Sequence, residues 1–271
     1  MPNENIPIFS DTHCHLDMPA FSEDFDTVVQ RAVDARLGFI IIPALDCATA
    51  KNALDLARKN PEFFHLTVGI HPNYAAEAAP DCLNQLHSLA KQPGVVGIGE
   101  IGLDYHWDYA TPSPQKAVLL PQLELARELA LPVVIHNRDA ADDLGPILLN
   151  WQASLSANHP LKTRPGVMHS YTGPQELALE LAEAGFFFGV GGPVTYKNGR
   201  DKQALVEALP RETILLETDS PYLPPHPHRG ERNEPAFIPL IAAKIAEVWG
   251  TTADEVGQIT TANARRLFDI P

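Results

Sequence analysis

The segment FSDTHCHLDMPAF, residues 9–21, places two histidines on either side of a cysteine, as His13-Cys14-His15. Imidazole and thiol groups this close together are typical of a metal site or a redox site, and they also arise by chance. Alternate side chains of an extended strand point to the same side, so His13 and His15 would face one way and Cys14 the other. This spacing favours two histidine ligands acting together, with Cys14 packed as a small apolar residue.

Five further side chains that can ligate a metal fall at or near the ends of apolar runs: His71, Glu100, His136, His169 and Asp219. Imidazole and carboxylate groups bind Zn²⁺, Mn²⁺ and related ions, and one carboxylate can bridge two ions. A pair of such ions can bind a phosphoryl group, activate water and stabilise the leaving oxygen. Each residue alone could be structural: Glu100 could form an ordinary ion pair, and Asp219 could cap a turn.

The elements that must position these residues are eight short apolar runs, rich in β-branched and aromatic residues. They span residues 6–13, 38–45, 63–72, 94–104, 131–136, 165–170, 185–192 and 213–219. Their hydrophobicity is nearly continuous, which is typical of parallel strands buried on both faces, and segments with helical spacing separate them. The pattern predicts one α/β domain over residues 1–271, a (β/α)8 TIM barrel rather than a doubly wound open sheet.

In such a barrel the carboxyl ends of the strands meet at one mouth, where catalytic residues lie. The candidate ligands therefore converge, and this convergence, more than any single residue, predicts a metal centre. Other histidines do not fit: His65 lies inside a run and is expected to pack in the core. A second His-x-His pair, His226 and His228, lies in the proline-rich segment 219–235, and we do not expect it to bind metal.

Composition restricts the class of protein. Of the 271 residues, 45% are apolar and 20% charged, which is typical of a globular protein, and the formal net charge is −14. Such acidity argues against a protein that coats nucleic acid by bulk charge, because that binding needs lysine and arginine to neutralise phosphates. It does not exclude an active site made locally positive by bound cations.

Three cysteines without paired ligand spacing make a disulfide framework improbable, and a reducing cytoplasm is the simplest compartment. The N-terminus lacks a basic region followed by a long apolar stretch, so no secretory signal is expected. No apolar run is long enough to span a bilayer. We therefore expect a cytoplasmic protein with no membrane association, and nothing in the sequence calls for an obligate protein partner.

Several motifs resemble a known family when read in order: DTHCHLD, VGIHP, GEIGLDY, PVVIHNRDA, GVMHSYTG and LLETDSPYLPP. They resemble the TatD family of metal-dependent hydrolases, which belongs to the amidohydrolase-like barrels. RGERNEPAFI and TTANARRLF extend the resemblance over nearly the whole chain. It implies a deoxyribonuclease that depends on divalent metal, often a 3′ to 5′ exonuclease that prefers single-stranded DNA or strand ends.

The resemblance also implies roles for the candidate ligands. His13, His15 and Asp219 would hold one divalent ion, and His136 and His169 the other. Glu100 would bridge the two ions, whose identity could be Mg²⁺, Mn²⁺ or Zn²⁺. Asp219 and Glu100 would be the catalytic carboxylates, with Asp219 accepting the proton of the attacking water.

Substrate contacts are predicted from positions near the mouth. His71 and Arg138 are candidates to hold a phosphate, and Arg229 is a weaker one. Tyrosines could stack a nucleobase, although packing is the favoured alternative for each: Tyr105, Tyr171 and Tyr196. The acidic surface predicts that short single strands or strand ends, rather than a long duplex, enter the mouth.

Two other functions remain open. The same metal centre could hydrolyse an amide, an ester or a lactone, because a fold does not fix the substrate. A non-catalytic metal-binding or nucleic-acid-binding protein is the third possibility, and the complete set of candidate ligands argues against it.

Overall fold

The structure, a computed structural model, describes residues 6–79 and 81–271. Eight strands form one sheet, and each strand pairs in parallel with the next along the chain. Their bounds are β1 (Phe9–Asp11), β2 (Leu37–Pro43), β3 (Phe64–Val68), β4 (Val95–Asp104), β5 (Val133–Arg138), β6 (Gly166–Met168), β7 (Phe187–Val190) and β8 (Ile214–Leu216). All eight expected strands are present, and the (β/α)8 barrel is confirmed. Part of the expectation about the N-terminus falls on residues 1–5, which lie outside the described residues.

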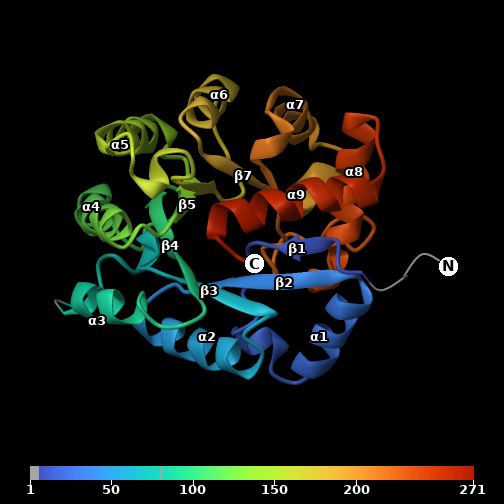
Figure 1. The fold of residues 1–271 in the computed structure, drawn as a ribbon, viewed down its shortest axis with the longest axis horizontal. Helices are drawn as coiled ribbons and strands as arrows, with labels where there is room; N and C mark the ends of the chain where they lie inside the picture. The colour runs from blue at the N-terminus through green and yellow to red at the C-terminus, as the bar shows by residue number, and fades with distance from the viewer. Residues whose placement is uncertain (1–5, 80) are drawn as a thin grey trace.

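Helices alternate with the strands and surround them in Figure 1. The outer helices are α1 (Phe25–Asp34), α2 (Cys47–Lys59), α3 (Cys82–Leu89), α4 (Pro112–Leu129), α5 (Ala141–Ser154), α6 (Gln175–Glu183), α7 (Arg200–Ala208) and α8 (Ile238–Trp249). The last helix, α9 (Ala253–Phe268), crosses one end of the barrel. Within the described ranges no single helix is long and apolar enough to cross a membrane. Taken together, the helices Pro235–Trp249 and Ala253–Phe268 are long and apolar enough, but they are bent by 104° relative to each other.

Both faces of the strands are buried, which explains the nearly continuous hydrophobicity. On β2, Ile40 and Ile42 join the larger apolar cluster, while Phe39 and Ile41 join a smaller cluster that includes Leu267 of α9. Alternate side chains thus fill two separate apolar layers, as the strand period requires. Helix α9 covers the end of the barrel at which the strands begin and contributes apolar residues to the smaller layer.

The barrel closes through residues just beyond β1 and β8. The Thr12 amide donates to the Leu216 carbonyl at 3.0 Å, and the His15 amide donates to the Ser220 carbonyl at 2.9 Å. Cys14 and Ser220 form an isolated parallel bridge between these segments. The carboxyl ends of the first and last strands are therefore held side by side.

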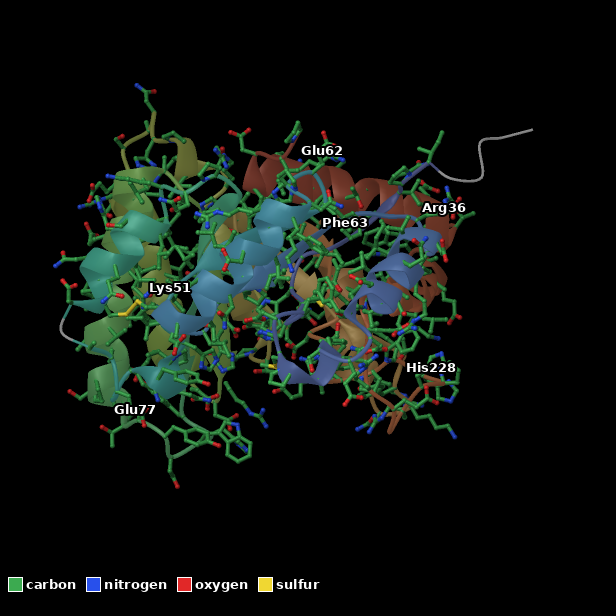
Figure 2. All side chains as sticks on the ribbon, turned by 90° about the horizontal axis from the view of Figure 1, so that it is seen from below. Arg36, Lys51, Glu62, Phe63, Glu77 and His228 are labelled. Carbon is green, nitrogen blue, oxygen red and sulfur yellow. A yellow bond between two sulfur atoms is a disulfide. The ribbon has the colours of Figure 1, made fainter. Side chains whose placement is uncertain are left out.

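The turns that precede the strands and the loops that follow them lie at opposite ends of the barrel. Arg36 and Glu62, on turns that lead into β2 and β3, lie at one end of the molecule in Figure 2. Glu77 and His228, on loops that follow β3 and β8, lie at the opposite end. The second end is the mouth, where the carboxyl ends of the strands open.

One expectation about the cysteines is wrong. Cys47 and Cys82, the first residues of α2 and α3, form a disulfide with their Cα atoms 6.5 Å apart. Their separation of 35 residues gives no local signal, because only the packing of α2 against α3 brings them together. The cysteine content therefore gives no support to the reducing compartment expected above.

His65 packs in the core as predicted, and its burial has a consequence for pH dependence. Its side chain lies edge-on to Phe39, with ring centroids 5.8 Å apart. Burial, assisted by the charge of Arg265, lowers the pKa of His65 to about 4. Between pH 6.5 and 4, His65 is protonated in the unfolded chain but not in the native protein. It therefore makes the native state less stable as pH falls through this range.

We expect His65→Phe, which keeps an aromatic ring without a titrating group, to flatten this part of the stability profile. Urea unfolding at pH 7 and at about pH 4.5 measures it. Wild type should lose about 2 kcal/mol more than the variant between the two conditions. Equal losses in the two proteins would show that His65 is protonated in the native state.

Candidate metal centre

The structure brings together at the mouth the six predicted metal ligands and His71, which is predicted to contact a phosphate. Each offers a ligand atom in one of three overlapping groups, with the atoms of each group within 4.8 Å of one another. The groups are His13, His15 and Asp219; His13, Glu100 and His169; and His71, Glu100 and His136. Because the groups share members, they form one continuous cluster rather than three separate sites.

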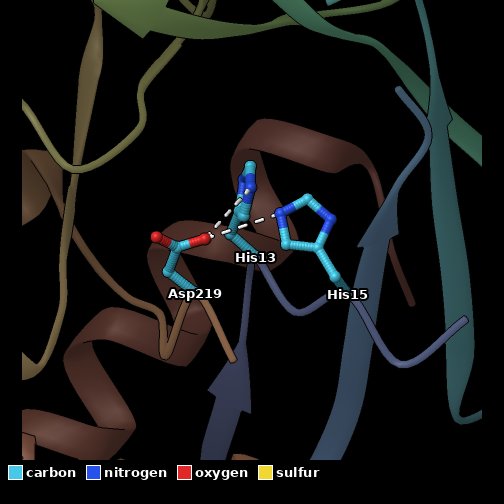
Figure 3. A group of neighbouring side chains, drawn as sticks. All are labelled: His13, His15 and Asp219. Carbon is cyan, nitrogen blue, oxygen red and sulfur yellow. Dashed lines mark ion pairs between the residues drawn. The ribbon is translucent and has the colours of Figure 1, made fainter. Parts of the chain in front are cut away.

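The first group joins the two ends of the barrel sheet, as Figure 3 shows. The Oδ1 atom of Asp219 lies 3.5 Å from Nε2 of His15 and 4.0 Å from Nε2 of His13. Both histidines face the same carboxylate, as their spacing predicts. Asp219 has a φ of 57°, in the left-handed region that aspartate tolerates better than most residues. This backbone conformation turns its carboxylate toward the histidines.

Glu100 lies between two sets of histidines. Its Oε1 atom is 2.9 Å from Nδ1 of His136 and 3.6 Å from Nε2 of His71. Its Oε2 atom is 3.3 Å from Nε2 of His13. Each carboxylate oxygen therefore faces a different half of the cluster, which is the geometry that a bridging carboxylate needs.

Both acidic residues are ionised, although Glu100 is buried and Asp219 is half-buried. Desolvation opposes the charge of Glu100, but the neighbouring His13 and His71 outweigh it and hold its pKa well below the usual range. Desolvation also opposes the charge of Asp219, and the hydrogen bond from His15 with the charge of His169 lowers its pKa nonetheless. The cluster thus keeps two negative charges that a cation can neutralise.

Two carboxylates that the sequence analysis missed support the histidines from behind. Asp104 Oδ2 lies 2.9 Å from Nε2 of His136, and Glu217 Oε1 lies 3.0 Å from Nδ1 of His169. Carboxylates in such positions fix the orientation of a ligating imidazole. The sequence could have identified both residues, because each lies at a strand end inside a motif that carries a candidate ligand, GEIGLDY or LLETDSP.

These contacts change the protonation of the two histidines. Burial lowers the pKa of His136, but hydrogen bonds to Asp104 and Glu100 overcome it and raise the value to about 9. Burial likewise opposes protonation of His169, and the charge of Glu217 with its hydrogen bond raises the pKa to about 10. Each carboxylate therefore favours the protonated form of the histidine that it contacts.

Two glycines make room for these close approaches. A Cβ atom on Gly189 would collide with the carboxylate of Glu217. Gly102 has a φ of 148°, and a Cβ there would collide with the backbone of His136. Any larger residue would push the neighbouring strand, or the carboxylate behind His169, out of place.

The cluster fits a divalent cation. Buried imidazole nitrogens of two candidate ligands lack a hydrogen-bond partner among the described residues: both nitrogens of His13 and Nδ1 of His15. Buried polar atoms are normally hydrogen-bonded, so unpartnered nitrogens beside ionised carboxylates indicate room for a ligand. Cys14 is fully buried with its Sγ 3.2 Å from Ser220 Oγ, and it belongs to none of the three groups. The expected packing of Cys14 is confirmed.

His71 has a fixed tautomer. Its Nδ1 accepts a hydrogen bond from the Asn73 amide at 3.2 Å, so the neutral ring carries its proton on Nε2. Burial lowers the pKa of His71, which favours the neutral ring. His71 therefore points an N–H donor into the cluster.

The remaining predicted contacts lie around the mouth. Arg138 ends β5 with an exposed guanidinium 5.7 Å from the ring centroid of Trp107. Arg229 lies 3.9 Å above the ring of Tyr196, in the loop after β8. His228 stacks on Phe237 and pairs with Glu231, and among the described residues neither it nor His226 belongs to one of the three groups.

The three tyrosines proposed for stacking are engaged elsewhere. The Tyr105 hydroxyl donates to Asp143 at 2.7 Å, and the Tyr196 hydroxyl donates to the Pro224 carbonyl at 3.0 Å. Tyr171 is buried and its hydroxyl donates to the Pro174 carbonyl. These contacts agree with packing, which the sequence analysis favours over base stacking for each of the three tyrosines.

Known proteins share this fold and its motifs. The model of a family described as TatD related DNase matches residues 10–269. The "Uncharacterized metal-dependent hydrolase YabD" of Bacillus subtilis is 38% identical over 260 residues, covering 96% of this chain and 98% of that protein. The "3'-5' ssDNA/RNA exonuclease TatD" of Erwinia tasmaniensis is 36% identical over 266 residues, covering 96% and 99%. The crystal structure of YjjV, a TatD homolog from Escherichia coli K12, has a TM-score of 0.88 at 34% identity, covering 97% and 99%.

We expect a divalent cation to stabilise the folded protein through this cluster. At a free concentration one hundred times the dissociation constant, binding adds about 2.7 kcal/mol to the free energy of unfolding. For a chain of this size, that raises the melting temperature by roughly 5–10 °C. Thermal unfolding of chelator-treated protein with and without Mn²⁺ or Zn²⁺ measures the shift.

The two His-x-His pairs provide a matched control. His15→Ala should remove most of the shift, whereas His228→Ala, in the pair outside the cluster, should retain it. The same shift in both variants would place the metal elsewhere.

Proposed function

The chain belongs to the TatD family of metal-dependent hydrolases, and from this premise we propose that it cleaves phosphodiester bonds of DNA. The proposed activity is a 3′ to 5′ exonuclease that acts on single strands or strand ends. Support comes from relatives over 35% identical whose names describe exonucleases of single-stranded DNA and RNA. The ionised, histidine-rich cluster at the mouth supports it independently.

The position of Glu100 carries the proposal of two metal ions. Its two oxygens face different groups of histidines, at 2.9 Å from His136 and 3.3 Å from His13. We assign one divalent ion, Mg²⁺, Mn²⁺ or Zn²⁺, to His13, His15 and Asp219. The other is assigned to His136 and His169, with Glu100 between them. Two such ions polarise a phosphodiester and lower the pKa of water.

A side chain of the protein can accept the proton that the attacking water loses. Asp219 is ionised and lies among three histidines, so its carboxylate can accept a proton from a water molecule in the cluster. Glu217 and Asp104 hold His169 and His136 in place from behind. A water molecule and a substrate phosphate would thus meet groups whose orientations are already fixed.

Two residues are assigned to the substrate phosphate. The Nε2–H of His71 points toward Glu100 from 3.6 Å, and it can donate to a phosphate oxygen that enters the cluster. Arg138 presents an exposed guanidinium at the mouth, and guanidinium groups bind phosphate oxygens in a bidentate manner. Arg229 is a further candidate, although its position over Tyr196 already engages its planar face.

The acidic surface supports preference for strand ends. Two divalent cations would reduce the formal charge of −14 by only four, so the surface still repels a long duplex. The bound cations and the guanidinium of Arg138 would add positive charge at the mouth. A short single strand can reach both without lying along the acidic exterior.

Digestion of end-labelled single-stranded DNA in the presence of each metal tests the proposed activity. We expect Asp219→Asn to lower kcat by about 10²–10⁴-fold, because the amide cannot accept a proton. A His136→Ala variant should also lose activity, and His228→Ala should not. Digestion at the wild-type rate by Asp219→Asn would disprove its assignment as the base.

A second substitution distinguishes this activity from hydrolysis of a neutral amide, ester or lactone. We expect Arg138→Ala to raise KM for an oligonucleotide by about tenfold, since a bond to a charged group is lost. Hydrolysis of an uncharged ester by the same variant should stay unchanged. If ester hydrolysis were the faster reaction and both substrates were affected alike, the phosphodiesterase proposal would be wrong.

A further inference from the structure

Exposed aromatic side chains gather at one place on this protein. Of all the aromatic residues in the described ranges, only four are highly exposed, and all lie on loops that follow strand carboxyl ends: Tyr74, Trp107, Tyr109 and Tyr222. Single exposed apolar residues are ordinary on any surface, but confinement of every exposed ring to the mouth is not explained by packing.

Two of these rings border the metal centre. The ring centroid of Tyr222 is 6.3 Å from that of His15, at an interplanar angle of 73°. The ring centroid of Tyr74 is 6.4 Å from that of His71, at 80°. Tyr222 follows β8 and Tyr74 follows β3, so the two tyrosines approach the cluster from different loops.

A third ring extends this border beside a positive charge. Trp107 is 48% exposed in the loop after β4, and Arg138 lies 5.7 Å from its ring centroid. Tyr109 lies beyond it, 6.2 Å from the Trp107 ring. Because the guanidinium lies over one face of the ring, a base can stack on the other face while its phosphate contacts Arg138.

We propose that Tyr74, Tyr222 and Trp107 form a base-stacking rim, which holds unpaired nucleobases while the phosphodiester lies at the metal centre. This inference rests on the proposed function and specifies how the substrate is chosen. Stacking on an aromatic ring tolerates any base, because every base has a flat face. The rim therefore selects for single strands without selecting a sequence.

The rim also explains how an acidic protein can distinguish strands. In a duplex each base is stacked on its neighbours and paired, so its face is not free for an aromatic side chain. An unpaired strand end can place its bases on the rim and its backbone in the cluster. Selection then depends on exposed base faces and requires no basic surface.

Tryptophan fluorescence provides a direct test, because Trp151 and Trp249 are buried and Trp107 is the exposed tryptophan of the three. The probe is a short oligothymidylate with phosphorothioate linkages that resist cleavage, added in Mg²⁺. We expect it to quench the emission of the wild-type protein. An abasic strand of equal length and charge should leave the emission unchanged. Equal quenching by both strands, or by neither, overturns the rim.

Kinetics test the two tyrosines. Tyr222→Ala and Tyr74→Ala should each raise KM for single-stranded DNA by about tenfold, and Tyr222→Phe and Tyr74→Phe should restore it. Hydrolysis of an abasic strand should be the same in all these variants. Leu120→Ala, at an exposed apolar residue on α4, is the control. Unchanged KM in both alanine variants overturns the assignment of the tyrosines.

The outcomes separate this inference from the activity on which it rests. Hydrolysis of normal and abasic strands at equal rates leaves the exonuclease proposal intact and overturns the rim. Base-dependent quenching without hydrolysis of any strand supports the rim and overturns the exonuclease proposal.

Discussion

Closure of the barrel between its first and last strands is the constraint on which the metal centre depends. His13 and His15 come from one side of this seam and Asp219 from the other, and backbone hydrogen bonds hold the two segments in register. Asp11 reinforces the seam, since its buried carboxylate accepts hydrogen bonds from the His13 amide and the Thr218 amide. Burial raises its pKa to about 7 in spite of those bonds. Residues from opposite ends of the chain can face one metal ion only because this seam is closed.

The electrostatics of the mouth follow from that geometry. Ionised Glu100 is buried and ionised Asp219 is half-buried, and charges in such places persist only when they are paired and hydrogen-bonded. Imidazoles provide the pairing, and Glu217 and Asp104 hold two of them from behind. The site is therefore preorganised: its groups have fixed orientations before any substrate arrives, as electrostatic catalysis requires.

The same fold supports many reactions, so the surroundings of the metal centre must select the substrate. Here those surroundings combine an N–H donor on His71, a guanidinium on Arg138 and exposed rings on the loops. Charge alone would select poorly, because the chain carries a formal charge of −14. In our proposal, stacking at the mouth supplies the selectivity that the exterior lacks.

Local patterns in the sequence determined the elements and the positions of the candidate ligands. Continuous apolar runs specify strands buried on both faces, and a spacing of two residues puts His13 and His15 on one side. Only the tertiary structure decided which distant residues meet. It paired Cys47 with Cys82, placed Glu217 behind His169, and left Trp107 exposed while burying Tyr171. The reason is physical: periodicity and hydrophobicity depend on near neighbours, whereas these contacts depend on how strands and helices far apart in the chain are packed.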